Sequence, residues 1–114
     1  MTEYPETQGK TTIDPRVLIK ICKLTSLEVS GVKRMDTGPH SVDDVLKKNY
    51  ADGVKINVQN NTVFVDLYLV LDHDTDLYKT SKLIQKKVSR AITELVGMDI
   101  GQVNIHVEDI NYQK

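Results

Sequence analysis

The segment from Leu77 to Ile110 constrains the fold more than any other part of the chain. Apolar residues recur at helical spacing up to Gly97, where a left-handed C-terminal cap belongs, and then alternate with polar residues as in a strand. Asp76 is placed to cap the start of this helix. The pattern predicts a compact α/β domain in which the following side chains are buried: Leu77, Ser81, Ile84, Val88, Ala91, Ile92 and Leu95 on the helix, and Val103, Ile105 and Val107 on the strand.

Length and composition narrow the class of protein. A chain of 114 residues with a net charge of -1 fits one domain and gives no global attraction to nucleic acids. The single cysteine, Cys22, excludes an intramolecular disulfide, which fits a reducing compartment. No apolar run approaches the roughly 20 residues that cross a bilayer, and the start of the chain lacks the apolar core of a signal peptide. We expect a cytoplasmic protein with one domain over residues 11–112, preceded by a flexible lead over residues 1–10.

The first half of the chain carries a second helix signal. Asp14 and Pro15 predict the start of a helix that runs to about Val29. Residues 31–35 are a candidate short strand, and a capping box predicts a short helix over residues 41–46. The expected apolar side of the first helix comprises Val17, Leu18, Ile21, Leu24 and Thr25.

A β-hairpin is the clearest local prediction. Two alternating apolar runs flank Asn60 and Asn61, and asparagine tolerates the positive φ angles of a two-residue turn. The same register places Lys55 opposite Asp66, which is a favourable cross-strand pair. A slip of one residue would expose every apolar side chain, so the register is well specified. The pairs expected on the buried face are Val58 with Val63, Ile56 with Val65, and Val54 with Leu67.

The order of elements predicts an α/β (α+β) fold, in which a single layer of two main helices packs on a small mixed sheet of three to four strands. The other sheet face would stay open, with Phe64, Tyr68 and His106 on it. Such a face either is covered, by a second subunit or by the ends of the chain, or stacks nucleic-acid bases. Because Asp66 and Glu108 would repel phosphate, we favour a covered face, and self-association is the form of it that we predict.

Two rows of basic side chains are the best functional clue in the residues themselves. If the two helices pack side by side, both rows should point outward together. A solvated face is one explanation, and a docking surface for lipid headgroups, an acidic protein segment or nucleic acid is the other. Only Leu83 projects from the long helix, which argues against direct membrane insertion. The rows comprise Arg16, Lys20 and Lys23 on the first helix, and Lys79, Lys82, Lys86 and Arg90 on the long one.

Signals for chemistry are weak. Three aspartates at residues 72, 74 and 76 imitate the opening of a calcium loop, but Leu77 and Leu83 occupy the positions that need glycine and a bidentate glutamate. Cys22, His40 and His73 have no partner at triad or metal-ligand spacing. We therefore expect no catalytic, metal-binding or cofactor-binding residues, and no enzyme.

Four stretches, taken together, resemble one protein family. They are an opening helix, GKTTIDPRVLIKI with LEVSGVKRM; a hairpin, DGVKINVQNNTVFVDLYLVLD; a long helix, IQKKVSRAITELVG; and a closing strand, VNIHVEDI. Over about residues 9–110 they resemble the alkaline shock protein family, small bacterial proteins linked to cell-envelope stress. The chain departs from the family at residues 72–74, where an aromatic-glycine turn is usual, and at Val96, where threonine is usual.

The resemblance implies no known catalytic activity, no cofactor and no defined site residues. It implies a cytoplasmic protein that can self-associate and is often held near the membrane by a membrane-embedded partner. We therefore expect a non-enzymatic interaction protein, a homo-oligomer that docks to an envelope-associated partner in stress response or envelope homeostasis. The alternative is a nucleic-acid-binding module that uses the basic helix face.

Overall fold

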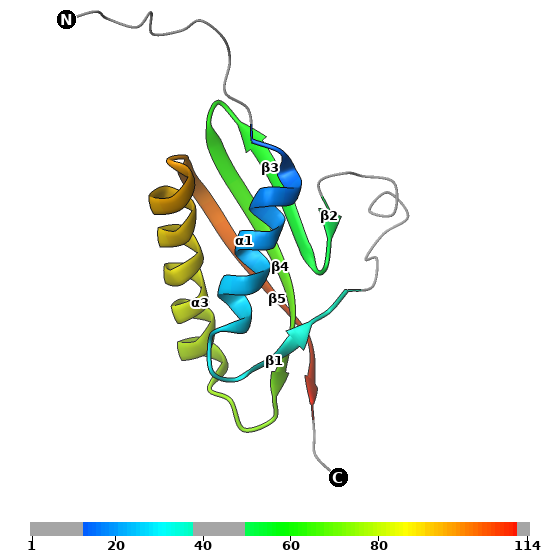
Figure 1. The fold of residues 1–114 in the computed structure, drawn as a ribbon. Coiled ribbons are helices and arrows are strands. Elements are labelled where there is room, and N and C mark those ends of the chain that lie inside the picture. Colours follow the sequence, from blue (N-terminus) through cyan, green and yellow to red (C-terminus); the bar gives the residue numbers. More distant parts are fainter. Residues whose placement is uncertain (1–12, 38–49, 112–114) are drawn as a thin grey trace, which may run out of the picture.

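The computed structural model describes residues 13–37 and 50–111, with only the backbone for residues 109–111. Two helices lie side by side on one face of a twisted sheet, as predicted (Figure 1). The expected lead, the short helix over residues 41–46 and His40 lie outside the described residues. The elements are α1 (Pro15–Leu27), β1 (Val32–Met35), β2 (Tyr50–Ala51), β3 (Val54–Gln59), β4 (Thr62–Asp72), α3 (Leu77–Ala91), the π-helix η1 (Ile92–Val96) and β5 (Asp99–Asn111).

Strand β4 is the centre of the sheet. It pairs with β1 and β3 in antiparallel fashion and with β5 in parallel fashion, so the sheet is mixed, as predicted. The described part of the sheet has five strands, against the three or four expected. The additional strand is β2, which pairs with β3 across a tight turn at Asp52 and Gly53, whose φ angles are 54° and 78°. An Asp-Gly pair is a strong signal for such a turn.

The β3–β4 hairpin forms in the predicted register. Asn60 and Asn61 take φ angles of 51° and 64°, which the two-residue turn requires. Lys55 lies opposite Asp66. All three predicted apolar pairs are present, and the β4 members of those pairs, Val63, Val65 and Leu67, are fully buried.

Both helix starts are capped as predicted. The Asp14 carboxylate accepts a hydrogen bond of 2.9 Å from the backbone N–H of Arg16, and Pro15 occupies the first turn. The Asp76 carboxylate accepts one of 3.0 Å from the backbone N–H of Lys79. These bonds satisfy amide groups that have no partner within the helix itself.

The buried side of α1 differs from the prediction. Val17 and Leu24 were expected to face the core, but their exposed fractions are 49% and 51%. The helix ends at Leu27, two residues before the predicted end. Apolar residues cover more than half of the helix circumference, and the sheet covers the arc that includes the small polar Ser26. The residues that α1 buries are Leu18, Ile19, Cys22 and Ser26.

Helix α3 buries the centre of its predicted stripe but not the ends. Leu77 is 43% exposed and Leu95 is 73% exposed, so both predictions of burial are wrong. Leu77 is the first helical residue, and Thr80, almost one turn later, is the first buried residue of the helix. Leu95 falls in η1, where the bond from the Gly97 N–H to the Ile92 carbonyl spans five residues and widens the turn. The stripe residues that are fully buried are Ile84, Val88 and Ile92.

Strand β5 closes the core at its far side. Val103 is buried as predicted, whereas Ile105 and Val107 are only partly buried against the core. The Gln85 side-chain amide donates a hydrogen bond of 2.9 Å to the Val103 carbonyl and ties α3 to β5. Gly97 takes a φ of 78°, the predicted left-handed cap that leads into this strand.

Candidate functional site

The sheet face away from the helices carries an aromatic cluster. Tyr68 on β4 and His106 on β5 are partners in the parallel register, and their rings stack with centroids 4.6 Å apart and planes 12° apart. Tyr50 on β2 meets the Tyr68 ring edge-on at 6.2 Å. The Lys55 ammonium lies 5.9 Å from the centroids of both tyrosine rings. The cluster therefore joins three strands and one cation on a single face.

Asp66 organises the polar part of the same face. Its Oδ1 atom lies 2.9 Å from His106 Nε2 and accepts a hydrogen bond of 3.1 Å from the Asn104 side-chain amide. These contacts hold the His106 ring in the plane that stacks on Tyr68. The Asp66 carboxylate is thus hydrogen-bonded within the sheet face, and about 30% of the side-chain surface is exposed.

Phe64 lies on this face two strand positions before Asp66. A Cβ atom built on Gly101 would fall 2.5 Å from the Phe64 ring, so the ring lies directly on the Gly101 backbone. The β4–β5 register shifts at this point, which leaves the glycine as an extra residue beside the ring. The predicted residues Phe64, Tyr68 and His106 share one face, and the rings of Tyr68 and His106 stack on each other.

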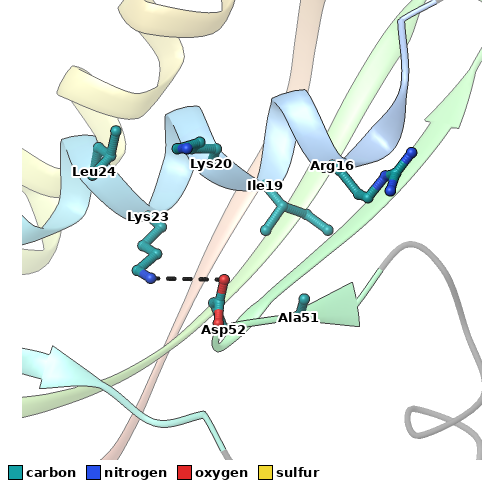
Figure 2. A pocket seen from close by; sticks show the side chains of 7 residues that line it. All are labelled: Arg16, Ile19, Lys20, Lys23, Leu24, Ala51 and Asp52. Atoms are coloured by element: carbon teal, nitrogen blue, oxygen red, sulfur yellow. Dashed lines mark ion pairs between the residues drawn. The ribbon is translucent and has the colours of Figure 1, made fainter.

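The basic row of α1 borders a pocket of about 340 Å³ (Figure 2). Its floor is apolar and its rim is charged. Arg16 pairs with Asp14 at 2.7 Å, and Lys23 pairs with Asp52 at 3.7 Å. Lys20 lies between them along α1. The ion pairs of the described residues on this rim involve Arg16 and Lys23 but not Lys20. The lining residues are Arg16, Ile19, Lys20, Lys23, Leu24, Ala51 and Asp52.

The basic row of α3 is a separate surface. Its four residues are exposed on α3, and none of them lines the α1 pocket. Lys82 lies 5.4 Å from the centroid of the Tyr78 ring, and Arg90 pairs with Glu94 at 3.1 Å. The pocket lies between the α1 row and β2 with its turn. The two rows therefore do not form the one continuous surface that side-by-side packing suggested.

Two contributors to these surfaces did not emerge from the sequence. Tyr50 extends the aromatic cluster, and Asp52 neutralises part of the basic pocket. The sequence placed Lys55 opposite Asp66 but did not predict that its ammonium lies over the tyrosine rings. Tyr50 lies in β2, and Asp52 follows it directly. The Asp-Gly turn after residue 51 was the available signal, because it predicts that the residues before it pair with β3.

Other chemical groups offer little reactivity. Cys22 is fully buried, and burial raises the pKa of its thiol to about 12. A thiol with this pKa stays protonated and is a poor nucleophile at neutral pH. The residues that the structure describes contain no group of three or more histidine, cysteine or acidic side chains that could hold a metal ion. In the same part of the chain, no helix is both long and apolar enough to cross a membrane.

Comparison with known proteins identifies a family that matches this chain. The model of the alkaline shock protein 23 family, described by a cell envelope-related function, matches residues 3–112. The uncharacterized protein Spy1535 of Streptococcus pyogenes is 32% identical over 114 residues, which cover 99% of this chain and 85% of the relative. The uncharacterized protein YqhY of Bacillus subtilis is 26% identical over 106 residues, which cover 91% of this chain and 78% of the relative.

The fold has solved counterparts. One structure of the MamM CTD matches with a TM-score of 0.53 at 9% identity and covers 90% of this chain and 100% of that chain. A second matches with a TM-score of 0.52 at 12% identity, covering 82% and 95%. At such identity the likeness concerns the fold alone.

Proposed function

The chain belongs to the alkaline shock protein 23 family, whose function is cell envelope-related, and on this basis we propose that it is a non-enzymatic cytoplasmic scaffold. It associates with itself and docks to an envelope-associated protein partner in stress response or envelope homeostasis. The observation that carries this proposal is the asymmetry of the fold. The two helices cover one sheet face (Figure 1), and the other face bears the cluster around Tyr68.

Self-association is supported by the chemistry of that sheet face. Aromatic side chains that are half-buried in one molecule supply large apolar area at small entropic cost when a second molecule covers them. Phe64, Tyr68 and His106 are all half-buried. The Asp66 bridge fixes the His106 ring, so little side-chain ordering remains to oppose association.

Docking is supported by the basic rows. Leu83 was expected to be the one apolar side chain that projects from α3, but Leu77 and Tyr78 are exposed as well. The four cations of the exposed α3 row support an acidic protein segment as the partner. The α1 row offers charge around an apolar floor. Both arrangements give electrostatic steering toward a negatively charged partner.

The alternative, nucleic-acid binding, has less support. A base that stacks on Tyr68 would bring its phosphate near the Asp66 carboxylate, which already accepts two contacts. Single-strand binders combine stacking platforms with a positive groove. Here the stacked rings of Tyr68 and His106 belong to β4 and β5, whereas the two basic rows belong to the helices. The geometry therefore favours the scaffold.

Tyr68→Glu should remove self-association through the sheet face. A carboxylate placed in a covered interface without a partner is costly to desolvate, so the dimer should dissociate to monomer. Sedimentation velocity at micromolar concentrations in about 1 M NaCl measures this contact alone, since the Debye length is then roughly 3 Å.

Leu95→Glu is the matched control, because Leu95 is 73% exposed on η1, within the helix layer. It should leave the dimer intact. Circular dichroism establishes that both variants are folded. A monomer for the unchanged protein over the whole concentration range would contradict self-association, as would equal association of the folded Tyr68→Glu variant.

A further inference from the structure

The pocket beside α1 has the character of a receptor for an acidic segment that carries apolar side chains. Ile19, Leu24 and Ala51 provide an apolar lining, and the three basic residues form the rim. Arg16 and Lys23 each already hold a carboxylate of the same chain. Lys20 is left as the one rim cation without such a partner among the described residues.

A segment with the complementary character exists on the same molecule. The connection from β4 to α3 carries three aspartates, at residues 72, 74 and 76, and Asp74 is exposed. Two apolar side chains follow at once, and they remain exposed although they begin a helix. Leu77 is 43% exposed and Tyr78 is 71% exposed. Acidic and apolar groups therefore project together from residues 74–78.

The two surfaces lie apart on one molecule. Figure 1 places β2, which borders the pocket, on the other side of α1 from α3. The acidic connection belongs to the α3 side, where Asp72, Asp74 and Asp76 share a polar hollow with Ser30 and Thr80. A contact between the acidic segment and the pocket must therefore join two copies.

We propose that residues 74–78 of one copy dock into the α1 pocket of the next, with Asp74 paired to Lys20 and Leu77 or Tyr78 seated on the apolar lining. The contact is head to tail, because the two surfaces differ. Repetition of a head-to-tail contact produces a ring or an open filament, unlike the closed dimer that the sheet face would give. This proposal extends the self-association in the proposed function but rests on a different surface.

The same geometry assigns a role to Asp14 and Asp52. Their carboxylates neutralise the two outer cations and leave a single charge in the middle of the rim. That arrangement limits non-specific attraction of polyanions and favours a segment whose carboxylate reaches Lys20. Pairing at a partly enclosed site is sensitive to salt but less so than at an open surface.

A charge swap tests the contact. At about 0.1 M NaCl, where the Debye length is roughly 10 Å, the unchanged protein should form species larger than a dimer, and about 1 M NaCl should dissolve them. Lys20→Glu and Asp74→Lys should each lower the association constant for these larger species by about tenfold or more, because like charges then face each other. The double variant, with both changes in one chain, should again form species larger than a dimer.

Two controls keep the test specific. Lys33→Glu on β1 and Asp99→Lys at the start of β5 make the same charge changes at exposed sites outside both surfaces and should leave the formation of these larger species unchanged. Sedimentation velocity and light scattering provide the readout, and circular dichroism confirms folding of every variant.

Three results would overturn the proposal. They are the absence of salt-sensitive species beyond the dimer, single reversals that behave like the controls, and a double variant that does not form the larger species again. Failure of the sheet-face interface has a different signature, since it leaves a monomer rather than a dimer in about 1 M NaCl. The two proposals can therefore fail separately.

Discussion

Ile84→Ala should lower the free energy of unfolding by about 2–5 kcal/mol. Ile84 is fully buried at the centre of α3, where it belongs to the core shared with α1 and the sheet. Alanine removes three carbons and leaves a cavity that two helices and a sheet cannot close without moving. The effect is a large fraction of the stability of a domain of this size.

Chemical denaturation measures the change, with Lys86→Ala as the control. Lys86 lies on the exposed side of the same helix, and its truncation should shift the unfolding free energy by no more than about 0.5 kcal/mol. A loss smaller than about 0.5 kcal/mol for Ile84→Ala would mean that the core lies on another side of α3.

The second large effect concerns a turn. Gly53→Ala should destabilise the domain more than Gly97→Ala, although both glycines have a φ of 78°. The left-handed conformation alone costs alanine about 1–2 kcal/mol. At Gly53 a Cβ atom would also lie 2.8 Å from the Asp36 carbonyl oxygen and 3.0 Å from that of Tyr68, both of which are backbone atoms. At Gly97 it would meet nothing within 4 Å.

The comparison separates backbone strain from steric conflict. Thermal and chemical unfolding of the two variants should give a difference of at least about 1 kcal/mol, with Gly53→Ala the less stable. The turn between β2 and β3, the β4 backbone at Tyr68 and the Asp36 backbone after β1 are hydrogen-bonded to one another and must shift to relieve the contact. Gly53→Ala should also perturb the Tyr68 ring environment, which near-ultraviolet circular dichroism reports. Equal losses for the two variants would show that the turn tolerates a side chain.

The sequence predicted correctly those elements that are determined by neighbouring residues in the chain. The register of the β3–β4 hairpin follows from strict alternation and from Asn60-Asn61, and both determinants lie within twenty residues of sequence. The caps at Asp14, Asp76 and Gly97 follow from side chains and from φ preferences at single positions. The mixed sheet under two helices follows from the order of these elements.

The predictions were wrong where tertiary contacts determine which side chains are buried and which segments pair. Helix α1 has apolar residues around more than half of its circumference, and only the position of the sheet selects the arc that includes Ser26 and leaves Val17 exposed. The π-helical turn that carries Leu95 outward ends at Gly97, where the chain leaves the helix, and regular helical spacing does not predict it. Strand β2 is two residues long, too short for periodicity to reveal.

The candidate surfaces were partly predictable for the same reasons. Alternation along β4 placed Phe64 and Tyr68 on one face, and the parallel register adds His106. Helical spacing identified both basic rows but not their separation. The pocket that the α1 row shares with Asp52 forms only when β2 pairs with the sheet. The stack of Tyr68 on His106 likewise depends on Asp66, which holds the ring from across the strands.

The central claim, docking to an envelope-associated protein, is tested most directly by co-sedimentation with membrane vesicles from the organism that encodes the chain. The full chain should bind these vesicles, and binding should be lost after protease treatment of the vesicles, remain after nuclease treatment, and be absent from protein-free liposomes of the same lipids. Reversal of Lys82, Lys86 and Arg90 to glutamate should abolish binding and change stability by less than about 1 kcal/mol, since exposed charges contribute little to folding. The Lys33→Glu variant should bind like the unchanged protein. Equal binding to liposomes, loss of binding on nuclease treatment, or no binding to native vesicles would contradict the account.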